Sequence, residues 1–256
     1  MPDDLVDALR AAGCVFAEDE ATVLRQAEAE GGDLGLMLAR RVAGEPLEQV
    51  VGWAEFCGLR IRTAPGVFVP RQRTRLVVEA TWWAVRQRRD PVVVDLCCGT
   101  GAIGVAVAAR VPGLELHAAD VDPDAVACAR VNLAEHVPGG QVHEGDLYDA
   151  LPPSLAGRVD AVAVNAPYVP SGEIRLMPPE ARLHEHHVAL DGGQDGLEIH
   201  RRVAGSAADW LVPGGRLVIE TSAAQAEGTA EACRDAGLVA SISEEDGAHV
   251  VRAVSR

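Results

Sequence analysis

The 256-residue sequence contains no lysine. All 23 of its basic residues are arginines, and with 38 acidic residues the formal net charge is −15. Nucleic-acid binding depends heavily on basic surface that neutralises phosphates, so direct binding of nucleic acid is not expected. The uniform use of arginine indicates a compositional bias of the source genome rather than a functional feature.

The chain also lacks long apolar runs, CxxC spacings and a leader-like start. No apolar stretch reaches the roughly 18 residues that a membrane-spanning helix needs, and MPDDLVDALR has neither the basic start nor the apolar stretch of a signal peptide. The six cysteines lie mostly within apolar patterns, as reduced core residues do. We therefore expect a cytoplasmic protein with no membrane span, disulfide framework or bound metal.

The first seventy residues differ in pattern from the rest. Residues 49–63 form short β-like runs broken at Gly58, which indicates a hairpin, and Pro65-Gly66 ends it. We expect three parts: a helical cap (1–48), a hairpin linker (49–70) and a main domain (71–256). Within the cap, helices closed by glycine are expected over residues 3–12, 18–30 and 34–43.

From residue 92 onward, strand, glycine turn and helix alternate. Such apolar strands are buried on both faces, which indicates an α/β fold with a parallel sheet covered by helices. The last two runs, 238–245 and 248–255, have no helix between them and predict an antiparallel pair at one edge. The main expected strands are VVVDL (92–96), LELHAAD (114–120), VDAVAVN (159–165) and GRLVIET (215–221).

A glycine-rich loop follows the first of these strands. Gly99, Gly101 and Gly104 satisfy GxGxxG at the start of a helix, and Asp120 ends the next strand. The pattern alone is weak, because both a dinucleotide and S-adenosylmethionine carry a ribose that needs a carboxylate at about this spacing. Asp120 serves either ligand.

Asp95 discriminates between these two possible ligands. It lies four residues before Gly99, where its charge would repel the pyrophosphate of a dinucleotide and attract the ammonium and sulfonium of S-adenosylmethionine. Alternatively, its side chain bonds backbone N–H groups of the loop, and the two roles can coexist. Further along, Asp146 can accept the adenine amino group while Leu147 packs on the ring, or Asp146 can cap a helix.

The strand at 159–165 ends in Asn165-Ala166-Pro167-Tyr168. The Asn165 side-chain oxygen and the Ala166 carbonyl can accept the two N–H bonds of a planar amide or amine. Pro167 stiffens the turn and Tyr168 offers a flat face, so transfer relies on proximity and orientation. The plain alternative is an ordinary strand-ending turn, in which Asn and Pro are common.

Over nearly its whole length the chain resembles the release-factor glutamine N5-methyltransferases. That resemblance implies a class I S-adenosylmethionine-dependent methyltransferase: a Rossmann-like, seven-stranded, mostly parallel sheet with a helical substrate-recognition cap. It also implies methyl transfer to a glutamine side-chain amide of a protein, a peptide chain release factor. The matching stretches are EPLEQVVGWAEFCGLRI, PGVFVPR, DLCCGTGAIGVAVA, GDLYDAL, NAPYVP, HVALDGGQDGL and LVPGGRLVIE.

The residues argued for above and the positions that match the family together give the expected site residues. Substrate contacts are expected from residues 165–168, here called the clamp, and from Arg71, Thr74 and Glu185. The cofactor set is Asp95, Cys97, Cys98, Gly99, Thr100, Gly101, Asp120, Asp146, Leu147 and Asn165, and the clamp is Asn165, Ala166, Pro167 and Tyr168.

Two departures from the family pattern affect the acceptor. Ala166 stands where the family has proline, and PRQRTR at 70–75 stands where it has PRPETE. The backbone carbonyl at 166 survives, but alanine does not fix φ. The second departure replaces two acids by arginines near the expected substrate entrance, so the identity of the acceptor stays open.

Other readings remain beside a protein-glutamine methyltransferase. They are a methyltransferase of a small-molecule amine or amide, a dinucleotide oxidoreductase, which Asp95 opposes, and a non-catalytic cofactor-binding module, which Ala166 motivates. His184, Glu185, His186 and His187 invite a metal site. Consecutive residues rarely converge on one ion, so we expect a solvated loop or substrate rim instead.

Overall fold

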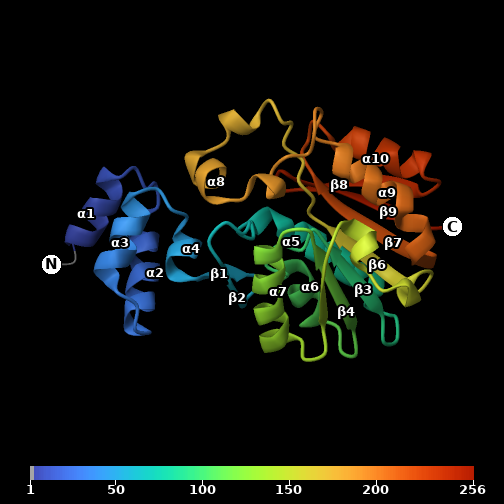
Figure 1. Ribbon diagram of the computed structural model, residues 1–256, viewed down its shortest axis with the longest axis horizontal. Coiled ribbons are helices and arrows are strands. Elements are labelled where there is room, and N and C mark those ends of the chain that lie inside the picture. The colour runs from blue at the N-terminus through green and yellow to red at the C-terminus, as the bar shows by residue number, and fades with distance from the viewer. Residues whose placement is uncertain (1–2) are drawn as a thin grey trace.

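The computed structural model describes residues 3–256 and begins with a bundle of short helices (Figure 1). Three of these match the expected helices to within a residue or two, and residues 1 and 2 of the expected cap lie outside the described part. Leu9 and Leu24 are fully buried at the centre of the bundle. The helices are α1 (Asp3–Ala11), α2 (Ala17–Ala29), α3 (Leu34–Val42) and α4 (Leu47–Val51).

Helix α4 differs from the expectation for residues 49–51, which the sequence pattern assigned to a β-like run. Pro46 precedes the helix with φ −53°, and Gly52 ends it in the left-handed conformation, with φ 83°. These flanking residues outweigh the β preference of the two valines. The hairpin itself is confirmed, with β1 (Trp53–Phe56) and β2 (Leu59–Arg62) pairing antiparallel.

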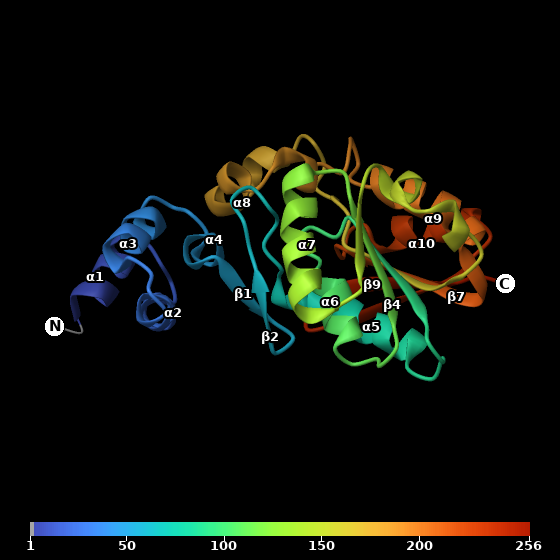
Figure 2. The same cartoon turned by 60° about the horizontal axis from the view of Figure 1, so that its bottom comes forward.

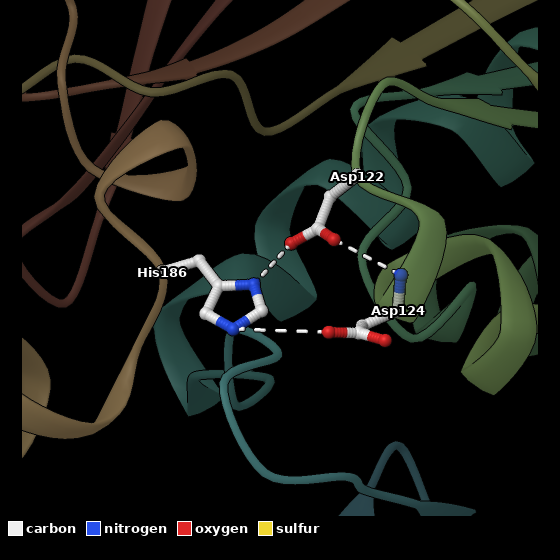
Figure 3. Close-up of side chains that lie close together, drawn as sticks. All are labelled: Asp122, Asp124 and His186. Carbon is white, nitrogen blue, oxygen red and sulfur yellow. Dashed lines mark hydrogen bonds and ion pairs between the residues drawn. The ribbon is translucent and has the colours of Figure 1, made fainter.

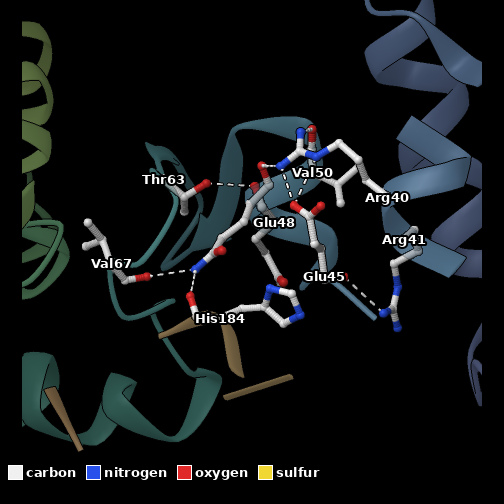
Figure 4. A network of polar contacts seen from close by, with 9 residues as sticks. Arg40, Arg41, Glu45, Glu48, Val50, Thr63, Val67 and His184 are labelled. Atoms are coloured by element: carbon white, nitrogen blue, oxygen red, sulfur yellow. Dashed lines mark hydrogen bonds and ion pairs between the residues drawn. The ribbon is translucent and has the colours of Figure 1, made fainter. Parts of the chain in front are cut away.

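Polar contacts fasten α4 to the rest of the chain (Figure 4). The Gln49 side-chain amide donates to the carbonyls of Val67 and His184, both at 3.1 Å. Arg41 of the helical bundle pairs with Glu180 at 2.7 Å. The bundle is therefore tied to residues near position 67 and to residues near position 184.

The main sheet has seven strands in the order β5-β4-β3-β6-β7-β9-β8. All neighbouring strands pair parallel except β9, which is antiparallel to β7 and β8 and confirms the expected edge pair. The strands are β3 (Val92–Leu96), β4 (Glu115–Asp120), β5 (Gln141–Glu144), β6 (Val159–Val164), β7 (Leu211–Thr221), β8 (Val239–Glu245) and β9 (Ala248–Val254).

Helices cover both faces of this sheet, as Figures 1 and 2 show. The apolar clusters on the two faces are separate: Val93 and Val218 belong to one, and Val94 and Leu217 to the other. This alternation explains why the strands are so uniformly apolar. The first face carries α5 (Arg75–Val85), α6 (Ala102–Ala108) and α7 (Pro123–His136), and the second carries α9 (Glu198–Trp210) and α10 (Ala226–Asp235).

A segment of short helices at 174–190, here called the covering segment, follows β6. It contains η4 (Ile174–Leu176), α8 (Pro179–His184) and η5 (His187–Ala189). Its backbone pairs with the linker, where the His186 N–H donates to the Gly66 carbonyl at 2.7 Å. Just after the covering segment, Asp191 forms an isolated parallel β-bridge with Val169, which lies a few residues after β6.

Among residues 3–256, no helix combines the length and apolar character that crossing a bilayer requires. Within the same residues, all six cysteines are free thiols, and three of them, at 98, 128 and 233, are buried. Burial raises the pKa of the Cys98 thiol well above its ordinary value, so this thiol stays protonated and unreactive.

Candidate active site

A cavity of about 380 Å³ opens at the carboxyl ends of β3, β4 and β6. Ligands of open α/β sheets bind at this edge, and the volume is in the range of small-molecule sites. Most of the expected site residues line it. Those that do so are Thr74, Cys97, Cys98, Gly99, Thr100, Asp120, Asp146, Leu147, Asn165, Ala166, Pro167 and Tyr168.

The glycine loop wraps one end of the cavity because its backbone takes conformations that side chains disfavour. Cys97, Gly99 and Gly101 all have positive φ, at 53°, 54° and 75°. A Cβ on Gly101 would lie 2.9 Å from a methyl carbon of Leu133. Gly101 itself does not line the cavity, so its part in the site is to let the loop pack closely on α7.

Two backbone N–H groups fix the Asp120 side chain beside the glycine loop. One carboxylate oxygen accepts from the Gly99 N–H at 2.8 Å, and the other from the Asp122 N–H at 3.0 Å. Burial raises the pKa of Asp120, and these two N–H groups oppose the rise. The carboxylate therefore faces the cavity in a fixed orientation, as a partner for hydroxyl groups must.

Asp95 lies beneath the loop and does not line the cavity. Its Oδ2 accepts from the Gly104 N–H at 2.8 Å, whereas its Oδ1 has no partner among the described residues. Burial raises the pKa of Asp95 to about 8. The loop-bonding alternative for Asp95 is thus observed, and any action on a bound cation would be through space rather than by contact.

Asp146 and Leu147 sit at the far side of the glycine loop. Leu147 has φ 49°, which turns the chain sharply after β5. The Asp146 side chain makes no capping hydrogen bond and instead pairs with Arg202 at 2.6 Å. An adenine amino group would therefore meet a carboxylate that already has one cationic partner.

The acceptor turn, residues 165–168, forms the opposite wall. Asn165 donates its side-chain amide to the Thr74 hydroxyl at 3.4 Å, and Ala166 is only 2% exposed. The Tyr168 carbonyl accepts from the Gln225 side chain at 2.8 Å. The turn is thus fixed on both sides while Asn165, Ala166 and Tyr168 still face the cavity.

Arg73 also lines this wall, and sequence reasoning did not select it. Its Nη2 donates to the Tyr168 hydroxyl at 2.8 Å, and its Nε donates to Glu220 at 3.1 Å. Burial raises the pKa of Tyr168, with the nearby Glu220 adding to the rise. Tyr168 is therefore a protonated phenol at neutral pH. Glu220 lies 147 positions from Arg73, so no local pattern indicates the pair.

Arg71 and Glu185 were expected to contact substrate, but neither lines the cavity. They form an ion pair at 2.6 Å, and Glu185 also accepts from the Val69 N–H at 3.1 Å. Burial raises the pKa of Glu185, and Arg71 opposes the rise. Through Val69 and Arg71, Glu185 joins the end of the linker and the start of the main domain to the covering segment. Direct contact with substrate stays a prediction for both Arg71 and Glu185.

The His186 side chain lies between two aspartates (Figure 3), and the neighbouring His187 lies 3.7 Å from Asp191. Its Nδ1 lies 2.6 Å from Asp122 and its Nε2 lies 3.8 Å from Asp124. Asp122 lines the cavity and caps α7 by accepting from the Asp124 N–H at 2.9 Å. Figure 3 shows the imidazole between the two carboxylates, where it links the covering segment to α7.

The remaining walls are apolar, and the sequence analysis assigned none of their residues to the site. Sequence reasoning missed them because the hairpin, linker and covering segment meet only in the folded chain. Among them are Phe56, Phe68, Met177, Val188, Leu190 and Ile199.

Comparison with known proteins shows which family the chain belongs to. The model of the methyltransferase small domain family matches residues 58–182. A release factor glutamine methyltransferase of Bradyrhizobium diazoefficiens is 33% identical over 259 residues, covering 98% of this chain and 86% of that relative. The chain belongs to the release factor glutamine methyltransferase family.

Two further relatives differ in the acceptors that their names state. A release factor glutamine methyltransferase of Geobacter sulfurreducens is 36% identical, and the match covers 75% of this chain and 66% of that relative, just under two-thirds of its length. A 4-amino-L-phenylalanine/4-methylamino-L-phenylalanine methyltransferase of Streptomyces pristinaespiralis is 39% identical, covering 71% of this chain and 62% of that relative. Membership of the family therefore leaves the acceptor to be established.

A solved structure shows the same fold at low identity. The T. thermophilus 16S rRNA N2 G1207 methyltransferase superposes with a TM-score of 0.59 at 20% identity, covering 80% of this chain and 50% of that one. The expected class I methyltransferase fold, with its Rossmann-like sheet, is thereby confirmed.

Proposed function

We propose that this family member is an S-adenosylmethionine-dependent N-methyltransferase that methylates the side-chain amide of a protein glutamine, in a peptide chain release factor. The observation that carries the proposal is that Asp120 and the acceptor turn line one cavity. A donor held by the first and an acceptor held by the second would meet within it. A cytoplasmic location, expected from the sequence, is part of the same proposal.

The residues present fit the methyl donor. Asp120 presents an oriented carboxylate to ribose hydroxyls, and Leu147 offers an apolar surface to the adenine ring. Beneath the loop, Asp95 keeps one buried oxygen without a partner among residues 3–256. A nearby cation compensates such a group by favouring its ionised form. The negative pyrophosphate of a dinucleotide would instead make the ionised form of Asp95 still less favourable.

The acceptor turn supplies the orientation that a poor nucleophile requires. S-adenosylmethionine, when bound, supplies an electrophilic methyl group on a sulfonium. The Asn165 side-chain oxygen and the Ala166 carbonyl accept the N–H bonds of the acceptor amide and aim its nitrogen. Tyr168 packs its ring on the planar group, and apolar walls such as Phe56 and Leu190 keep water out.

A small-molecule arylamine is the second candidate acceptor. Arg73 places a guanidinium at the acceptor wall, where the family pattern has an acid, and a relative 39% identical is named for 4-amino-L-phenylalanine. An aromatic amine is planar, so the same turn can orient it. The carboxylate of such an amino acid would also find a cation nearby.

The test is methyl transfer from labelled S-adenosylmethionine to two acceptors presented separately: purified release factor and 4-amino-L-phenylalanine. Label in release factor supports the proposal, and label only in the amino acid moves the function to the second candidate. Donor binding by calorimetry without transfer to either acceptor, or to proteins and small molecules of a cell lysate, would favour the non-catalytic module.

A further inference from the structure

We propose that Arg73 is a positioning residue that braces the acceptor turn and takes over the stiffening role lost at Ala166. The inference rests on the proposed function, since it concerns the turn that holds the acceptor. Alanine leaves φ free where proline would restrict it. The Ala166 N–H donates no hydrogen bond among the backbone contacts of residues 3–256, so nothing at that peptide replaces the lost restraint.

Contacts at Tyr168 supply the restraint instead. The Arg73 guanidinium donates to the Tyr168 hydroxyl at 2.8 Å, at the tip of the ring. The Gln225 side chain donates to the Tyr168 carbonyl at 2.8 Å, at the base of the residue. These two hydrogen bonds hold both ends of Tyr168. They keep its ring in the cavity wall and so limit movement of the Ala166 carbonyl.

Glu220 makes this brace rigid. It belongs to β7, whose neighbour β6 leads directly into the turn, with Val164 and Ile219 in register. The Glu220 side chain is 2% exposed, and its second oxygen has no partner among the described residues. A buried carboxylate is costly unless it is paired. Glu220 therefore fixes the Arg73 guanidinium through Nε, and the fixed guanidinium in turn holds the Tyr168 hydroxyl through Nη2.

The bracing uses the shape of arginine as well as its charge. The guanidinium directs Nε toward Glu220 and Nη2 toward Tyr168 from one rigid plane. Lysine has a single ammonium on a flexible stem and cannot hold both partners in this geometry. A merely electrostatic role would survive the change to lysine, whereas bracing would not.

The test compares variants of the full chain. Arg73→Ala removes the brace, Arg73→Lys keeps the charge, and Arg73→Met with Glu220→Gln removes the brace without leaving a buried unpaired carboxylate. Arg75→Ala is the matched control, because Arg75 is two positions away, does not line the cavity and makes no ion pair among the described residues. Ala166→Pro is added to Arg73→Ala to restore stiffness by another route.

Two readouts separate bracing from other roles. The first is kcat and KM, with whichever of release factor or 4-amino-L-phenylalanine the wild type methylates. The second needs no activity: the chain has only two tyrosines, so ring-labelled tyrosine gives two sets of NMR signals, which Tyr168→Phe assigns. Tyr148 is buried in the core, where its hydroxyl donates to the Val203 carbonyl at 3.2 Å, and serves as an internal reference.

We expect all three Arg73 variants to lower kcat by about 10- to 100-fold, the loss that a misplacement of about 1 Å can cause, with S-adenosylhomocysteine affinity unchanged. The Tyr168 signals should shift and broaden while those of Tyr148 stay, and Ala166→Pro should recover part of kcat in the Arg73→Ala chain. Arg75→Ala should change none of these.

Unchanged Tyr168 signals in all Arg73 variants would overturn the proposal, whether or not an acceptor has been found. So would a rise in acceptor KM at constant kcat, which would assign Arg73 to binding. If the Tyr168 signals shift but neither acceptor is methylated, the brace stands and the proposed function fails.

Discussion

Asn165 donates its side-chain amide to the Thr74 hydroxyl, across 3.4 Å and between the end of β6 and the start of α5. This contact uses the nitrogen of the amide and leaves its oxygen without a donor among the described residues. The free oxygen is the one that an acceptor N–H requires. The contact with Thr74 therefore orients the Asn165 amide so that its oxygen is free to accept a hydrogen bond before any substrate binds.

Replacement of Asn165 by alanine should abolish most transfer while leaving donor binding nearly intact. Asp120→Ala should do the reverse and weaken donor affinity, because a carboxylate fixed by two backbone N–H groups is lost. Calorimetry with S-adenosylhomocysteine and steady-state kinetics measure the two effects. Equal loss of donor affinity in both variants would show that the two walls of the cavity are misassigned.

Thr74→Val tests the orientation of the Asn165 amide. The change keeps the size of the side chain but removes the hydroxyl that receives the amide N–H, so both amide rotamers become accessible. We expect kcat to fall by about 3- to 10-fold, since a typical hydrogen bond contributes roughly 1 kcal/mol. Donor affinity serves as the control, and a kcat equal to that of the wild type would mean that Thr74 does not orient Asn165.

Asp95 should make the stability of the fold depend on pH. Burial raises its pKa to about 8, so the folded protein holds this proton more tightly than the unfolded chain does. The contribution is fully present below about pH 4, the ordinary value, and is lost as the pH rises to about 8.

Asp95→Asn cannot ionise and still accepts from the Gly104 N–H. The wild type should therefore lose more stability than this variant between about pH 5 and about pH 8 in urea unfolding. A bound cation should favour the ionised form, so wild-type donor affinity should increase over the same range. Parallel pH profiles of the two chains would contradict this role for Asp95.

The ion pair of Arg71 and Glu185 should respond unequally to loss of each partner. Arg71→Met strands a buried carboxylate and should destabilise the fold by about 3 kcal/mol. Glu185→Gln leaves a partly exposed arginine that water can solvate, and should cost only about 1 kcal/mol. Urea unfolding near pH 8 measures both changes. Equal losses would mean that the Glu185 carboxylate is less isolated than its burial indicates.

Features fixed by local pattern were predictable from the sequence. Apolar runs located the strands, and the close spacing of Gly99, Gly101 and Gly104 located the loop after β3. Helix α4 was missed because the β preference of Val50 and Val51 hid a helix set by its ends. Periodicity cannot show such an effect, since it lies in the flanking Pro46 and Gly52.

The site was predictable where one motif supplies it and not where distant segments meet. The residues from Asn165 to Tyr168 were found because they are contiguous. The brace from Glu220 through Arg73 joins residues 147 positions apart, and the contact of His186 with Asp122 spans 64. Asp95 was assigned from its charge and its place before the glycine loop, and only the fold shows that it lies beneath the loop and not in the cavity wall.

The most direct test of the account is to locate the transferred methyl group. Wild-type protein and Asn165→Ala are each incubated with deuterium-labelled methyl donor and purified release factor, and the product is sequenced by tandem mass spectrometry. If the acceptor turn holds a glutamine amide, label appears on the side-chain nitrogen of a glutamine with the wild type, and almost none appears with the variant. Label at any other atom, or equal label with both proteins, would contradict it.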